Sequence, residues 1–148
     1  ETKEFNTEDF AKFHPGGMSG KKLYRRVSDV YVQNEKPKGL PSANIKEVIV
    51  EITKKRLGAA AVVDDNNHVA GIITDGDLRR MLEKSDSFEK LTAKDIMNIN
   101  SKSINADELA VEALDILRKN DISQLIVTEN DLYAGIIHLH DLVREGII

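Results

Sequence analysis

Two short segments of this chain place a polar side chain and a carboxylate at the same spacing. Thr74 precedes Asp77 by three residues, as His138 precedes Asp141. Each segment follows a short apolar run and begins a predicted helix. The side chain of Thr74 or His138 and the free N–H groups of that helix should therefore point towards the same place. That arrangement suits a phosphate, and a carboxylate one helical turn later suits the hydroxyls of a ribose. We therefore regard these four residues as candidate ligand-binding residues.

The same residues are also typical of a helix start that binds nothing. Threonine is a common N-cap, and the helix dipole favours an aspartate in the first turn. His138 departs from the first copy, and because a charged histidine is disfavoured at a helix N-terminus, we expect its neutral form. His138, His140 and Asp141 lack the fourth ligand of a zinc site, so we expect no metal there.

His14 lies in a His-Pro-Gly-Gly segment, residues 14–17, which is typical of a turn that ends a helix. The chain has no cysteine, no nucleophile elbow and no recognisable pair of buried carboxylates to complete a catalytic set. Any catalysis that involves His14 would therefore need residues that this chain lacks.

An internal repeat organises the chain. Residues 70–80 recur as residues 134–144 at a constant offset of 64, and seven of the eleven positions are identical. A repeat of this length indicates two like units that bury their cores against each other. Clefts at such a junction are natural places for small ligands.

Each unit is expected to contain a helix, two strands and a second helix. In the first unit, Asn44 and Glu47 predict a capping box, the cations at residues 54–56 suit the last helical turn, and Gly58 is expected to close the helix in the left-handed region. We expect strands at 59–63 and 69–74 and a helix at 75–83, then a helix through 110–117, strands at 124–128 and 133–137, and a helix at 139–144. A short strand is expected to lead into each unit, at residues 29–30 and 95–96.

The fold class is therefore α/β in the mixed (α+β) sense, with two pseudo-symmetric β-α-β-β-α units packed through their sheets. We divide the chain into residues 1–26, the remnant of an upstream domain with a linker, residues 27–84, the first unit, and residues 91–148, the second. Phe10 and Phe13 favour a remnant over a flexible arm, because such arms rarely carry apolar pairs.

Composition narrows the classes of partner. The net charge is −4 over 148 residues and there is no long basic stripe, so we expect neither nucleic acid nor an anionic membrane as a partner. No apolar run approaches the ~20 residues that span a bilayer. The absence of cysteine is compatible with a reducing compartment, and we expect a cytoplasmic protein.

The duplicated unit, with Gly-Ile-Ile-Thr-x-x-Asp-Leu at its end, resembles a tandem pair of CBS domains over residues 27–148. Residues 7–23, which include the His-Pro-Gly-Gly segment, resemble the junction in D-arabinose 5-phosphate isomerases of the sugar-isomerase (SIS), KpsF/GutQ-type family. In those enzymes an isomerase domain runs into a CBS pair. The second-copy ending Gly-Ile-Ile-His-Leu-His-Asp-Leu is similar to that family as well.

This resemblance implies a parent that interconverts D-ribulose 5-phosphate and D-arabinose 5-phosphate, on the route to the Kdo sugar of lipopolysaccharide or capsule. It implies that the position of His14 belongs to the active site of the intact parent. The remaining active-site residues would lie upstream, so we expect this chain alone to be inactive and to serve as a regulatory module.

The resemblance also implies a regulatory ligand. CBS clefts commonly take adenine nucleotides, with the aspartate on the ribose and the threonine near the phosphate. That places Thr74 and Asp77 in one cleft and Asp141, with His138, in the other. Gly58, Ala59 and Ala60 would line a pocket for the base. The activated sugar CMP-Kdo, as an end product, is the other ligand that we consider, and no cofactor is required.

Two other functions compete with a nucleotide sensor. The CBS pair would instead be a scaffold with vacant clefts, dimerising through its helices and holding the parent as a tetramer. Residues 78–82 with Leu142, Val143 and Ile147 are expected to supply the apolar face. A CBS pair from a transporter or from another enzyme is the weaker alternative, because it does not explain the His-Pro-Gly-Gly segment.

Overall fold

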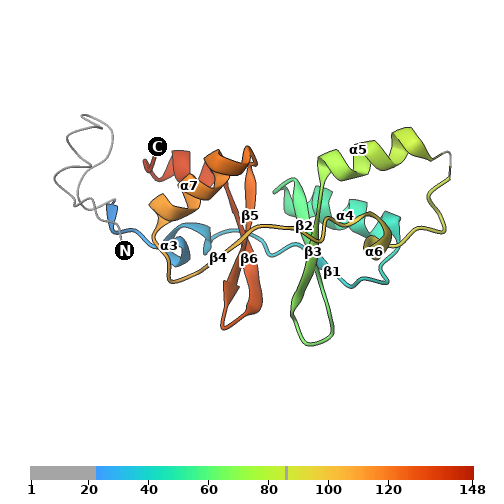
Figure 1. Ribbon diagram of the computed structural model, residues 1–148, viewed down its shortest axis with the longest axis horizontal. Coiled ribbons are helices and arrows are strands. Elements are labelled where there is room, and N and C mark those ends of the chain that lie inside the picture. Colours follow the sequence, from blue (N-terminus) through green and yellow to red (C-terminus); the bar gives the residue numbers. More distant parts are fainter. Residues whose placement is uncertain (1–22, 86) are drawn as a thin grey trace.

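The computed structural model of the chain describes residues 23–85 and 87–148 (Figure 1). His14 and most of the segment that we interpreted as a domain remnant lie outside these residues. The helices are α3 (Val27–Tyr31), α4 (Ile45–Lys55), α5 (Asp75–Lys84), α6 (Ala93–Ile96), α7 (Ala110–Asn120) and α8 (Leu139–Arg144). The strands are β1 (Lys38–Gly39), β2 (Ala59–Val63), β3 (Val69–Thr74), β4 (Ser103–Asn105), β5 (Gln124–Glu129) and β6 (Leu132–His138).

The strands form two three-stranded sheets of the same topology. β1 pairs in parallel with β2, which pairs antiparallel with β3, and β4, β5 and β6 repeat this arrangement. With α4 and α5 in one half and α7 and α8 in the other, each half is a β-α-β-β-α unit. The fold class predicted from the repeat is confirmed.

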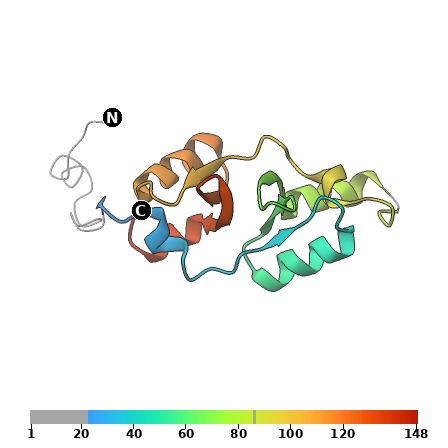
Figure 2. The same ribbon diagram turned by 90° about the horizontal axis from the view of Figure 1, so that it is seen from below.

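The two sheets lie next to each other in the middle of the molecule, and the helices cover the outer sides (Figures 1 and 2). β2 shows why the sequence packs this way. Ala59, Ala61 and Val63 alternate along the strand and join a buried cluster with Ile126 and Ile136 of the second sheet. The residues between them face α4. Both faces of this strand are therefore buried, as its continuous apolar run indicates.

α4 begins at the predicted capping box. The side chain of Asn44 accepts a hydrogen bond from the Glu47 N–H at 2.8 Å, and the Glu47 carboxylate accepts one from the Asn44 N–H at 2.9 Å. The left-handed residue that caps the C-terminus is Arg56, at φ 63°, and not Gly58 as we expected. Gly58 is also left-handed, at φ 72°, and lies just beyond the end of the helix.

Each unit is completed by a short helix that belongs to the other half of the sequence. α3 begins the first unit in sequence but packs on the second, where the Val27 N–H donates to the carbonyl of Glu108 at 2.8 Å and Val27 lies in the core. α6 lies near the start of the second unit in sequence but packs on the first, where the Ala93 N–H donates to the carbonyl of Ala43 at 2.8 Å. The two halves are thus linked by an exchange of helices.

The expected lead-in strands at residues 29–30 and 95–96 are wrong, because these residues belong to the exchanged helices. Asp29 accepts a hydrogen bond from the Arg26 N–H at 3.0 Å, and Asp95 accepts one from the Thr92 N–H at 2.8 Å. Both aspartates therefore occupy the third position of a helical turn, where they satisfy an N–H that the helix leaves free.

The glycine of each repeated segment makes room for a side chain carried by an exchanged helix or by the residue just after it. A Cβ at Gly135 would lie 2.8 Å from the ring of Tyr31, and a Cβ at Gly71 would lie 3.0 Å from the side chain of Met97. Real Cβ atoms essentially never show the first distance, and the second is tighter than nine in ten real Cβ contacts; the Cβ at Gly71 would also lie 2.8 Å from the carbonyl oxygen of Asn98. The repeated glycine thus fixes where the exchanged segment docks.

The apolar face that we expected for dimerisation is only partly exposed. Leu142 and Ile147 are buried in the core of the second unit, with 0% and 1% of their surfaces exposed. Val143 and Leu82 are exposed. Leu142 and Ile147 are therefore core residues, because α8 packs its apolar side against α7 and α3.

Candidate functional site

The first candidate pair, Thr74 and Asp77, forms the start of α5. Thr74 Oγ1 accepts a hydrogen bond from the Asp77 N–H at 3.3 Å, and Asp77 Oδ2 accepts one from the Thr74 N–H at 2.9 Å. The other oxygen of Asp77 accepts a charge-assisted bond from Arg80 at 2.6 Å. Another N–H of the first turn, that of Asp75, donates to the carbonyl of Gly58 at 3.0 Å. This corner is a complete capping box.

The second candidate pair, His138 and Asp141, starts α8 in the same way but with more partners. Asp141 Oδ2 accepts bonds from the His138 N–H and from Asn34 Nδ2, both at 2.7 Å, and Oδ1 accepts one from Arg144 at 2.8 Å. Asp141 is 3% exposed, and it is the one charged residue among the buried residues of the described chain. Its three partners compensate the cost of burying the carboxylate.

His138 supplies the N-cap of α8 through its ring. Nδ1 accepts a hydrogen bond from the His140 N–H at 2.9 Å, which requires that this nitrogen carry no proton. Partial burial lowers the pKa of His138, and the neighbouring His140 lowers it further, against the opposing charge of Asp141. The neutral form expected from the sequence therefore agrees with the local geometry.

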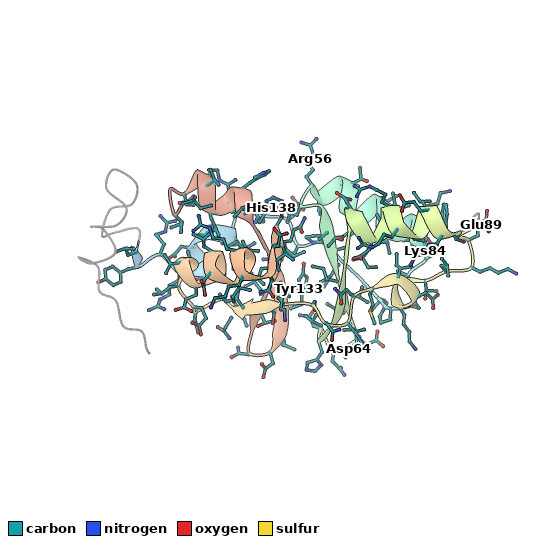
Figure 3. The ribbon with its side chains drawn as sticks, turned by 45° about the horizontal axis from the view of Figure 1, so that its top comes forward. Arg56, Asp64, Lys84, Glu89, Tyr133 and His138 are labelled. Carbon is teal, nitrogen blue, oxygen red and sulfur yellow. The ribbon has the colours of Figure 1, made fainter. Side chains whose placement is uncertain are left out.

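A pocket of about 330 Å³ opens beside this second corner, and we call it the Arg56 cleft. It brings the end of α4 and the segment before β1 against the start of α8. The lining residues are Gln33, Asn34, Glu35, Lys55, Arg56, Leu57, His138, His140, Asp141 and Arg144. Figure 3 shows Arg56 projecting from the upper edge of the molecule where the halves meet, with His138 below it.

The two aspartates line different pockets. Asp77 and Arg80 line a pocket of about 300 Å³ together with residues of α6 and the segment before it. Asp141 lines the Arg56 cleft. The structure therefore does not bring the two candidate pairs together in one groove.

Gly58, Ala59 and Ala60 do not share one surface. Ala59 is fully buried between the sheets, whereas Ala60 faces α4 and lines a third pocket. Gly58 meets the second unit, because a Cβ there would lie 2.8 Å from Nε2 of Gln124. Of the three, Gly58 is nearest in sequence to the Arg56 cleft.

That third pocket, about 400 Å³ between β1, β2 and α4, contains one of the candidate residues from the sequence, Ala60. It is lined by small residues, among them Gly39, Ala60 and Ala93. The carboxylate of Glu51 at its edge accepts from the Lys38 N–H at 3.0 Å. Its lining is mixed, because Lys38, Glu47 and Glu51 lie beside the small apolar residues.

Within the residues that the structure describes, no group of three or more His, Asp or Glu side chains is placed to hold a metal ion. In the same residues, none of the helices combines the length and the apolar character that crossing a membrane requires.

Comparison with known sequences identifies the repeated unit. The CBS domain family matches residues 27–84 and 93–147. The chain is 37% identical over 145 residues to the arabinose 5-phosphate isomerase KdsD of Escherichia coli K12, covering 97% of the chain and 44% of that protein. KdsD of Pseudomonas aeruginosa PAO1 is 38% identical over 150 residues, with coverage of 100% and 46%. The chain thus spans less than half the length of these relatives.

Solved structures with this fold are distant in sequence. A CBS domain protein from Pyrobaculum aerophilum, complexed with AMP, has a TM-score of 0.71 at 19% identity and covers 79% of this chain and 89% of its own. CBSX2, in complex with AMP, has a TM-score of 0.67 at 22% identity, with coverage of 83% and 96%. The AcuB protein of Vibrio cholerae has a TM-score of 0.74 at 22% identity, with coverage of 84% and 92%.

These matches agree with the duplicated two-sheet fold described above. This chain belongs to the CBS-domain family and carries two copies of the domain.

Proposed function

We propose that this chain is the regulatory CBS pair of an arabinose 5-phosphate isomerase. The observation that carries the proposal is the identity of 37–38% to KdsD enzymes over 97–100% of this chain. The isomerase reaction itself, between D-ribulose 5-phosphate and D-arabinose 5-phosphate, would be carried out outside residues 27–148, with His14 as a contributor from the junction.

The regulatory ligand that we propose is an adenine nucleotide. Two proteins of the same fold are described in complex with AMP, and a pocket at the corner of the second unit here is lined by cations. The phosphate would lie between Arg56, Lys55 and the His138 ring, with Arg144 behind them. Charge-assisted hydrogen bonds from a guanidinium suit phosphate oxygens.

Asp141 would meet the ribose in this arrangement. Its Oδ1 accepts one bond, from Arg144, and so keeps a lone pair for a hydroxyl group. Thr74 and Asp77 would contribute less, because their hydrogen-bonding groups already satisfy each other in the capping box.

A scaffold with vacant clefts is the second candidate. The complete capping box of the first corner favours it, because that corner needs no ligand to satisfy its polar groups. In a scaffold, the exposed Val143 and Leu82 would belong to a contact between two copies of the chain.

Isothermal titration of the chain with AMP separates the two proposals. Heat of binding with saturation supports the sensor, and no heat at millimolar AMP supports the scaffold. CMP-Kdo is titrated in parallel, since an end product would be a reasonable effector even though nothing in the fold favours it. For the parent enzyme, isomerase activity with and without the bound ligand tests whether the module regulates.

A further inference from the structure

We infer that the two pseudo-symmetric corners of this CBS pair are not equivalent: the Arg56 cleft beside α8 binds the phosphate of the ligand, and the corresponding corner beside α5, where Asp121 takes the place of Arg56, rejects it. The inference rests on the proposed nucleotide-binding function and specifies its site and stoichiometry. One phosphate ligand then binds per chain.

The repeat register relates Arg56 to Asp121. Each is the left-handed residue that ends the first long helix of its unit, at φ 63° and φ 52°. The Arg56 N–H donates to the carbonyl of Ile52, and the Asp121 N–H donates to the carbonyl of Leu117. Since both pairs of residues differ by the same offset of 65, the two positions are structurally equivalent.

The Arg56 cleft carries an excess of cations. Lys55, Arg56 and Arg144 face two carboxylates, those of Glu35 and Asp141. Two of these cations are engaged: Lys55 lies 3.6 Å from Glu35, and Arg144 lies 2.8 Å from Asp141. Arg56 is exposed and has no ion pair within the part of the chain that the structure describes. Its guanidinium is the cation available to a phosphate.

At the corresponding corner of the first unit, carboxylates outnumber cations. At the offset of 65, Lys55 is replaced by Asn120 and Arg56 by Asp121, and at the offset of 64 that relates residues 70–80 to 134–144, His140 is replaced by Gly76. Arg80 remains, but it is bound to Asp77 at 2.6 Å. Residues 99–101, which follow α6 as residues 33–35 follow α3, include no charged side chain. A phosphate at this corner would meet the exposed carboxylate of Asp121, and like charges at contact distance repel.

The paired variants Arg56→Asp and Asp121→Arg test the inference, because each introduces the residue that the other unit already holds in the same left-handed conformation. We titrate AMP, and separately pyrophosphate, into the wild-type chain and both variants by calorimetry. The expected result is one AMP per wild-type chain, a loss of at least about tenfold in affinity for Arg56→Asp, and an affinity within about twofold of wild type for Asp121→Arg.

Two AMP molecules per wild-type chain would overturn the inference, as would an Arg56→Asp affinity within twofold of wild type or an equal loss in both variants. If AMP does not bind the wild-type chain, the proposed nucleotide function fails, and pyrophosphate decides the inference instead. Pyrophosphate is expected to bind once per chain and to be lost in Arg56→Asp; the absence of pyrophosphate binding to wild type overturns the inference too.

Discussion

The phenol of Tyr133, on β6 of the second unit, donates a hydrogen bond of 2.7 Å to the carbonyl of Pro37, just before β1 of the first. Tyr133 is buried, and burial raises the pKa of its phenol, with Glu51 and Tyr31 acting in the same direction. Two further bonds join the backbone of Tyr133 to Asn67 of the first unit. This residue therefore ties the two sheets together through side chain and backbone.

Tyr133→Phe should lower the free energy of unfolding by about 0.5–1.5 kcal/mol, because the buried Pro37 carbonyl keeps its bond from the Ala61 N–H at 3.1 Å but loses the phenol as a second donor, while the ring stays in place. Urea denaturation followed by circular dichroism measures the change. Thr53→Val, which removes an exposed hydroxyl from α4, is the control and should stay within about 0.5 kcal/mol of wild type. Equal stabilities of wild type and Tyr133→Phe would mean that the bond contributes nothing.

Thr74→Val should destabilise the chain by about 1 kcal/mol, because the capping box of α5 loses the acceptor for the Asp77 N–H. Thr74→Ser keeps the hydroxyl and should stay close to wild type. AMP affinity should be unchanged in both variants if the ligand lies in the Arg56 cleft. A loss of affinity without a loss of stability in Thr74→Val would instead make Thr74 a ligand contact.

Stability should fall as the pH is lowered from about 7.5 to about 5.5, and His138 should account for part of the fall. Burial and His140 hold the pKa of His138 below its unfolded value of 6.5, so the unfolded chain binds more protons in this range. The contribution of His138 to the free energy of unfolding is complete above about pH 6.5, and it is lost as the pH falls towards the pKa of His138 in the folded chain.

His138→Thr, which copies the N-cap of α5, should flatten this dependence, whereas Thr74→Ser, which keeps every histidine in place, should leave it unchanged. The measurement is the urea midpoint at several pH values. An unchanged slope in His138→Thr would exclude His138 as the responsible group.

Arg56→Gly and Asp121→Gly should separate stability from binding. Both residues are left-handed, a conformation that costs a residue with a side chain about 1 kcal/mol, so each change should leave stability unchanged or raise it by up to that amount. Only Arg56→Gly should weaken AMP binding, as seen by calorimetry. Loss of binding in both variants would indicate an effect of the helix ends themselves.

Ala93→Val should stabilise the first unit by about 0.5–1 kcal/mol, because it partly fills the pocket of about 400 Å³ between β1, β2 and α4. The aligned position in α3 is Val27, which is fully buried in the second unit, so the larger side chain already suits the equivalent site. Thermal unfolding compares the variant with wild type. A lower melting temperature would show that the added methyl groups clash with neighbouring side chains that cannot rearrange.

The units of the fold were predictable because the repeat, the helical stripes and the capping residues all act locally. Asn44 with Glu47 predicted the start of α4 to the residue. The exchanged helices were not predictable, because α3 has five residues and α6 has four, too few to show a helical period. Their positions depend on contacts with the opposite half.

The candidate site was predicted in part. Thr74, Asp77, His138 and Asp141 do lie where strands end and helices begin, but whether such a corner is open or saturated depends on tertiary partners such as Asn34. The cations at residues 54–56 suggested only a favourable helix end. Their approach to the start of α8 requires the docking of the two sheets, which no local pattern specifies.

The exchange of helices means that the boundary between the repeats in sequence is not a boundary in space. Cutting the chain between residues 85 and 93 would leave α3 on the first fragment and α6 on the second, although each helix completes the core of the other fragment. The two units are therefore expected to unfold together, in one cooperative transition. Leu23 packs in the core of the second unit, and Asn34, shortly after α3, donates to the carboxylate of Asp141. A movement of the chain at Leu23 would therefore shift the second unit first, and through α3 and Asn34 it would reach Asp141.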